Sequence, residues 1–138
     1  MSLDYNEVFK FMKEFGIDIL NQYGELIIDE HTNTYVGIEN CKDIEEVKLY
    51  VVYSLCRPIG KGLETRDANR LLKKFNKYFN VELTREDMRL MYGELCYMHK
   101  LEEFKEFIKK GFPIEELKTT MQADIKYGWN ADSYDART

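Results

Sequence analysis

The sequence predicts a predominantly helical α+β protein, with an N-terminal helix, one β-hairpin and then a compact bundle of three to five helices. Apolar residues recur at helical spacing in several stretches, and two β-prone stretches lie close together between residues 25 and 38. The chain has 138 residues, 44% of them hydrophobic, which is enough for one core. We expect a single globular domain over residues 1–126 and an extended or poorly ordered tail over 127–138, which lacks periodicity.

The first predicted element is an amphipathic helix over residues 4–15. Asp4 and Glu7 have the spacing of a capping box, and Gly16 suits the end of the helix. The expected apolar face consists of Val8, Phe9, Met12 and Phe15.

Two strands are predicted next, at about residues 25–30 and 34–38, joined through His31, Thr32 and Asn33. Residues 17–20 are open between a third strand and an extension of the first helix. Because a lone hairpin is marginal in water, this one must lie against helices.

Residues 44–56 satisfy both a strand pattern and a helical one. We predict a helix, because Asp43 and Glu46 have capping spacing and thirteen residues are long for a strand. Apolar residues lie on most of its sides, so the helix should be central and buried. Pro58 is expected to end it, and residues 57–63 to form a turn-rich loop.

Residues 65–79 have the clearest helical periodicity. Their apolar stripe consists of Ala68, Leu71, Leu72, Phe75 and Phe79. A short connection leads to a capping signature at Thr84 and Asp87, so the two helices should pack as a hairpin.

The stretch 84–111 contains two apolar stripes that point in different directions. The first consists of Met88, Met91, Leu95 and Met98, joined by Tyr92, Cys96 and His99; the second consists of Leu101, Phe104 and Ile108. We therefore predict a break near His99 and Lys100, with helices at 84–98 and 101–110 and core positions for Cys96 and His99. Pro113 opens one more short helix.

The net charge of −5 conceals a basic segment. Residues 57–80 contain seven Lys and Arg against two acids, a local charge of +5. The cations are Arg57, Lys61, Arg66, Arg70, Lys73, Lys74 and Lys77. The last five share one face of the predicted helix, whereas Arg57 and Lys61 belong to the preceding loop with Gly60 and Gly62. Together they predict a surface for phosphates or an acidic protein. The alternative is a solvated outer face with no partner.

A helix-turn-helix arrangement of 65–79 with 84–98 is disfavoured, because the second helix opens with Arg85, Glu86 and Asp87. Acids at that end would meet phosphates unfavourably, and the cations lie on the other helix.

The three cysteines are Cys41, Cys56 and Cys96; their odd number and wide spacing favour reduced thiols and a cytoplasmic location. Cys96 and His99 have helical spacing for a metal site or a nucleophile pair, but further ligands are not evident. We predict no catalytic residues, no metal, no cofactor and no small-molecule substrate. No apolar run is long enough to predict a membrane span.

The tail contains three aromatic residues among acids: Tyr127, Trp129 and Tyr134. An aromatic, acidic segment of this kind is predicted to bind a partner or a neighbouring copy, with packing on the body or disorder as alternatives.

The stretch from S-L-C-R-P-I-G-K-G-L through the basic helix to L-T-R-E-D-M-R-L-M-Y resembles small bacteriophage and prophage proteins of Gram-positive bacteria whose function is unknown. The resemblance implies a cytoplasmic accessory protein and assigns no functional residues.

The leading hypothesis is a non-enzymatic intracellular accessory protein that acts through protein–protein interaction or self-association, with an aromatic or acidic partner surface. The alternative is a nucleic-acid-associated protein that binds the phosphate backbone through residues 57–77.

Overall fold

The computed structural model describes residues 3–118. The elements are α1 (Tyr5–Phe15), β1 (Ile19–Leu20), β2 (Glu25–Asp29), β3 (Thr34–Gly37), α2 (Ile44–Arg57), the π-helical turn η1 (Pro58–Gly62), α3 (Thr65–Phe79), α4 (Arg85–Met91), the π-helical turn η2 (Tyr92–Cys96) and α5 (Leu101–Lys109). Residues 114–118 form a further helical turn. The predominantly helical α+β class is confirmed.

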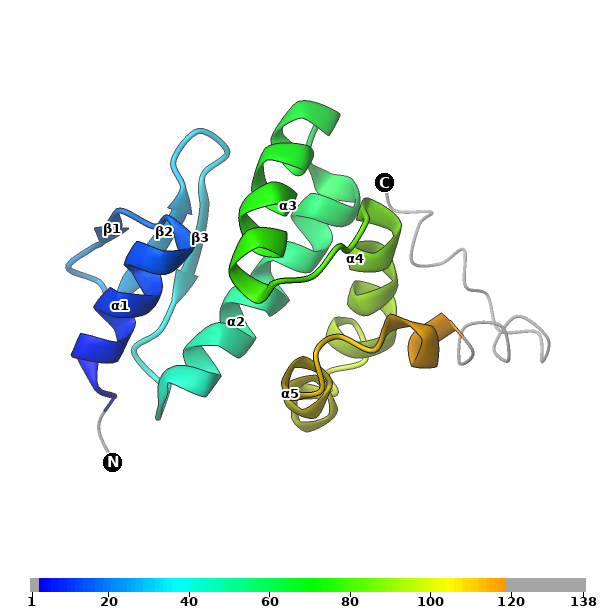
Figure 1. The fold of residues 1–138 in the computed structure, drawn as a ribbon. Helices are drawn as coiled ribbons and strands as arrows, with labels where there is room; N and C mark the ends of the chain where they lie inside the picture. The colour runs from blue at the N-terminus through cyan, green and yellow to red at the C-terminus, as the bar shows by residue number, and fades with distance from the viewer. Residues whose placement is uncertain (1–2, 119–138) are drawn as a thin grey trace.

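Helix α2 is the centre of the molecule. Figure 1 shows α1 and the strands on one side, α4 and α5 on the other, and α2 with α3 between them. Helix α2 contacts α1, β3, α4 and α5. Its buried residues are Val47, Leu49, Val51, Val52, Leu55 and Cys56. The predicted central helix is therefore confirmed, and it extends one residue further than expected.

The three strands form an antiparallel sheet in the order β1-β2-β3. Ile19 pairs with Ile27, and Leu26 pairs with Val36. A bulge between Ile27 and Asp29 turns the end of β2. The open alternative for residues 17–20 is resolved in favour of a short strand.

Helix α1 has its predicted boundaries, and its predicted apolar face is confirmed at Val8, Met12 and Phe15 but wrong at Phe9. The Asp4 side chain accepts a hydrogen bond from the Asn6 N–H at 2.9 Å, and Gly16 ends the helix with φ 97°. Phe9 is 53% exposed, whereas Phe11 is buried. The face that packs against α3 centres on Phe11, whose ring lies 5.0 Å from that of Tyr78, so Phe9 falls outside the contact.

The expected loop at 57–63 is wrong, because the chain continues from α2 into η1. Pro58 has no N–H to donate, and the turn widens so that the Leu63 N–H donates to the Pro58 carbonyl at 2.9 Å. Arg85 donates to the carbonyls of Ile59 and Leu63. These bonds satisfy carbonyl groups that a helix end normally leaves unpaired.

The break in the stretch 84–111 is confirmed. Thr84 and Asp87 form the predicted capping box, and His99 adopts φ 55°, a left-handed conformation that ends the segment. The first apolar stripe is only partly correct, because the wider turn η2 changes the helical phase. Met98 is 41% exposed and His99 is also exposed, so the predicted core positions of both are wrong.

No helix within residues 3–118 combines the length and apolar character needed to cross a membrane. The tail predicted over 127–138, including Tyr127, Trp129 and Tyr134, lies outside the described residues.

Candidate interaction groove

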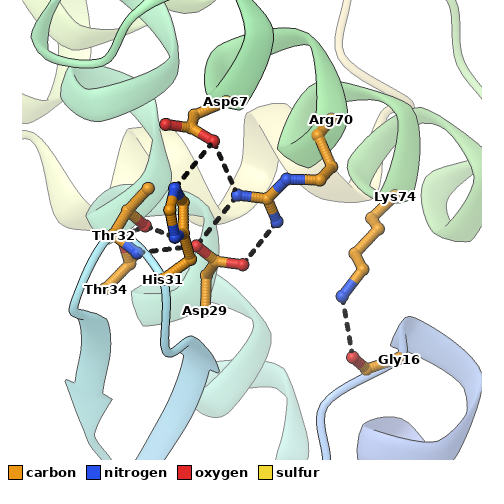
Figure 2. A network of polar contacts seen from close by, with 8 residues as sticks. All are labelled: Gly16, Asp29, His31, Thr32, Thr34, Asp67, Arg70 and Lys74. Carbon is orange, nitrogen blue, oxygen red and sulfur yellow. Dashed lines mark hydrogen bonds and ion pairs between the residues drawn. The ribbon is translucent and has the colours of Figure 1, made fainter.

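The tip of the β2–β3 hairpin is fixed by a polar network (Figure 2). The Asp29 carboxylate accepts from the Thr32 N–H at 3.0 Å and from the Thr32 hydroxyl at 2.7 Å. Arg70 Nη2 donates to Asp29 Oδ2 at 3.1 Å and to Asp67 Oδ1 at 3.0 Å, while Nη1 donates to Asp29 Oδ1. The hydrogen bonds from Arg70 hold the pKa of Asp29 well below its ordinary value.

Arg70 and Lys74, two of the seven predicted binding cations, form contacts that hold the fold together. Arg70 joins α3 to the hairpin, and Lys74 Nζ donates to the Gly16 carbonyl at 3.0 Å, at the end of α1. Both side chains therefore use part of their hydrogen-bonding capacity in contacts that hold α3 against its neighbours.

The other five cations do not share one surface. Arg66, Lys73 and Lys77 are exposed along one side of α3. Lys61 is half-buried in η1. Arg57 is exposed at the end of α2, where it lines a groove instead of the α3 face.

The groove lies between the hairpin tip and the end of α2, and we call it the hairpin groove. Its volume is about 500 Å³. The hairpin contributes Thr32, Asn33, Thr34 and Tyr35; α2 contributes Tyr53, Ser54 and Arg57; and the turns contribute Pro58, Gly62, Leu63 and Tyr92. The network behind the hairpin tip holds one wall in position.

The chemistry of the hairpin groove is that of a binding surface for an anionic, partly apolar segment. Arg57 is the single cation among the described lining residues, and none of them is an acid. Tyr35, Tyr53 and Tyr92 supply aromatic surface. Burial raises the pKa of Tyr53, and its hydroxyl donates to the Cys96 carbonyl at 3.4 Å.

Both π-helical turns contribute to this groove. Such turns account for under about 1% of residues in globular proteins and are often found at functional sites. Here η1 supplies Pro58 and Gly62, and η2 supplies Tyr92. The groove is therefore lined in part by residues of both turns.

The other predicted features of the basic segment have structural explanations. Gly60 does not offer its backbone to an anion: a Cβ placed there would lie 3.0 Å from the Arg89 backbone, and its carbonyl accepts from Arg89 Nη2 at 3.1 Å. Gly60 thus permits the close crossing of η1 and α4.

Cys96 is buried and its thiol donates to the Tyr53 carbonyl at 4.0 Å, whereas His99 is exposed. Burial, with the neighbouring Cys96 thiol as a further cause, raises the pKa of Cys56. Within residues 3–118, no three His, Cys, Asp or Glu side chains are grouped to hold a metal ion.

Sequence reasoning identified Arg57 and Gly62 but missed the other nine residues of the groove. The available signal was Pro58 directly after a helical pattern, which marks a departure from regular geometry but does not locate a pocket.

Searches against models of protein families, curated proteins and solved structures found no match to this chain.

Proposed function

We propose that this protein is a non-enzymatic interaction module whose hairpin groove binds an acidic segment of a partner protein. One observation carries the proposal: the groove has a single exposed cation, Arg57, and no acid among its described lining residues, in a chain of net charge −5. A carboxylate of the partner would accept charge-assisted hydrogen bonds from the guanidinium. The three tyrosines would contact the apolar part of the same segment.

The rigidity of the site supports this proposal. The contacts among Arg70, Asp29 and Thr32 fix the hairpin wall of the groove. Arg85 holds the turn η1, which contributes other lining residues, through two backbone carbonyls. A wall held before binding loses less conformational entropy when a ligand docks.

The proposal places the module in the cytoplasm, supported by the unpaired thiols of Cys41, Cys56 and Cys96.

The test uses a display library of random linear peptides and immobilised full-length protein. We expect selection to enrich peptides that contain Asp or Glu. The Arg57→Gln variant should bind a selected peptide about tenfold or more weakly, because a charge-assisted hydrogen bond is lost. The Arg57 side chain has no hydrogen bond or ion pair with another described residue, so the variant should fold normally.

Arg66→Gln is the matched control, because Arg66 is also exposed but lies on α3 outside the groove. It should bind the selected peptide like the wild type. Selection without acidic enrichment, or equal loss of binding in both variants, would overturn the proposal.

A second candidate function is association with nucleic acid through Arg66, Lys73 and Lys77. These three exposed cations share one side of α3 and span about 16 Å along its axis, a distance that covers two or three phosphates. In its favour, none of them is used in the contacts that hold α3 in the fold.

The experiment that separates the candidates measures binding to single- and double-stranded DNA and RNA over a range of salt concentrations. Reversing Arg66, Lys73 and Lys77 to Glu should abolish binding, whereas Arg57→Gln should leave it unchanged. About three released counterions should make the logarithm of affinity fall with a slope of about −2 to −3 against the logarithm of salt concentration. Absence of binding at low salt would remove this candidate.

A further inference from the structure

Strand β3 is the outer strand of the sheet, beside the hairpin groove, and within residues 3–118 no further strand pairs with it. In an antiparallel ladder, successive residues direct their backbone groups alternately toward and away from the neighbouring strand. The Ile38 N–H donates to the Gly24 carbonyl at 2.8 Å, and Leu26 pairs with Val36. The alternation therefore directs the N–H and C=O groups of Tyr35 and Gly37 away from β2.

Among the described residues, the ladder with β2 does not use these four backbone groups. Within residues 3–118, neither Tyr35 nor Gly37 has a backbone hydrogen bond to a residue outside the sheet. Tyr35 is 50% exposed, and a Cβ placed on Gly37 would have no atom within 4 Å. The edge also lacks the charged residues and proline with which proteins usually block strand pairing, since β3 reads Thr-Tyr-Val-Gly.

The edge leads into the hairpin groove. Tyr35 and Thr34 belong to both the strand and the groove lining, and Arg57 lies in the opposite wall. A chain segment paired with β3 would reach this cation, while its alternate side chains faced the tyrosines.

We propose that the partner segment binds as an added β-strand, pairing its backbone with Tyr35 and Gly37 and directing a carboxylate to Arg57. This inference rests on the proposed function of the hairpin groove and specifies the partner as an extended, acidic, strand-forming segment. Regular backbone pairing supplies affinity that depends little on sequence, and the Arg57 contact selects the acidic residue.

The first test changes only the peptide. Each backbone N–H of a peptide selected on the wild-type protein is replaced in turn by N-methyl. Strand pairing predicts that binding falls about tenfold at alternate positions and is retained at the positions between them, because only every second N–H faces β3. A scan without this alternation overturns strand addition.

The second test removes one donor from the protein. Gly37→Pro eliminates the outward N–H and should weaken the same peptide by about tenfold. Gly37→Ala is the matched control: it keeps the donor, its Cβ enters open space, and it should bind like the wild type. Should Gly37→Pro fail to fold, amide hydrogen exchange of the wild type replaces it, with protection of Tyr35 and Gly37 on adding peptide as the expected result.

The outcomes separate the two proposals. Loss of binding in Arg57→Gln together with full binding in Gly37→Pro would overturn strand addition and leave the hairpin groove as the binding site. Amides of Tyr35 and Gly37 that exchange equally with and without bound peptide would overturn it in the same way. Failure to select any acidic peptide would overturn both.

Discussion

Arg70 on α3 and Asp29 at the end of β2 form a two-pronged ion pair, with Nη1 and Nη2 donating to the two carboxylate oxygens (Figure 2). The Asp29 side chain is only 8% exposed, whereas that of Arg70 is 39% exposed. The pair therefore compensates a largely buried carboxylate with a guanidinium that still reaches solvent. It connects the hairpin wall of the groove to the helical body.

Removing this guanidinium should destabilise the fold. Arg70→Ala leaves the Asp29 carboxylate buried with Thr32 as its remaining partner, and we expect the free energy of unfolding to fall by about 2 kcal/mol. Urea denaturation measures the change. Arg66→Ala, on the exposed side of the same helix, should change stability by less than about 0.5 kcal/mol. Similar losses in the two variants would contradict the structural role of the pair.

The same pair predicts an acid-dependent loss of stability. Arg70 lowers the pKa of Asp29 from its ordinary value of 3.8, so the unfolded chain takes up this proton at a higher pH than the folded one. The stabilising contribution is complete above the ordinary value and is lost as the pH falls below it, toward the lowered pKa. Unfolding measured in wild type and Asp29→Asn should show a stability difference that shrinks below about pH 4. A difference that is independent of pH would contradict this assignment.

The helix boundaries could be predicted from the sequence because the signals are local. Thr84 and Asp87 are three residues apart and cap each other in the structure. Gly16 ends α1 through its own backbone conformation. Such contacts depend on a few neighbouring residues and so leave a pattern that can be recognised without the fold.

The candidate site could not be predicted in the same way. Asp29 and Arg70 are 41 positions apart, so the sequence assigned Arg70 to an open basic face. The hairpin groove likewise combines residues from the hairpin, α2 and two π-helical turns. The turns break the regular 3.6-residue period, which is also why Met98 was placed in the core although it is exposed.

The crossing of η1 and α4 should be sensitive to a single methyl group. In Gly60→Ala the added Cβ meets the Arg89 backbone at 3.0 Å, and we expect a loss of about 1–3 kcal/mol from overpacking. Gly62→Ala is the matched control in the same turn, since its nearest contact, the Arg57 carbonyl, is at an ordinary 3.6 Å. Thermal unfolding compares the variants. Equal stability of the two would show that the turn adjusts freely.

Arg85 should be required for the geometry of η1. Its Nε donates to the Ile59 carbonyl at 2.9 Å and its Nη2 to the Leu63 carbonyl at 3.1 Å, so one planar group closes the turn. Lysine has a single ammonium and cannot reproduce this fork, and Arg85→Lys should cost about 1–2 kcal/mol. Hydrogen exchange of the η1 amides and chemical denaturation both report the effect. Wild-type exchange and stability in Arg85→Lys would mean that charge alone suffices.

The two methionines that the sequence placed on one stripe should respond differently to truncation. Met91 is fully buried on α4, whereas Met98 is 41% exposed beyond the π-helical turn η2. Met91→Ala removes buried apolar volume and should cost about 2–5 kcal/mol. Met98→Ala should change the free energy of unfolding by less than about 0.5 kcal/mol, because its side chain remains in contact with water. Urea denaturation of both variants decides the matter: equal losses would indicate a continuous regular helix through residue 98, and unequal losses the change of helical phase at η2.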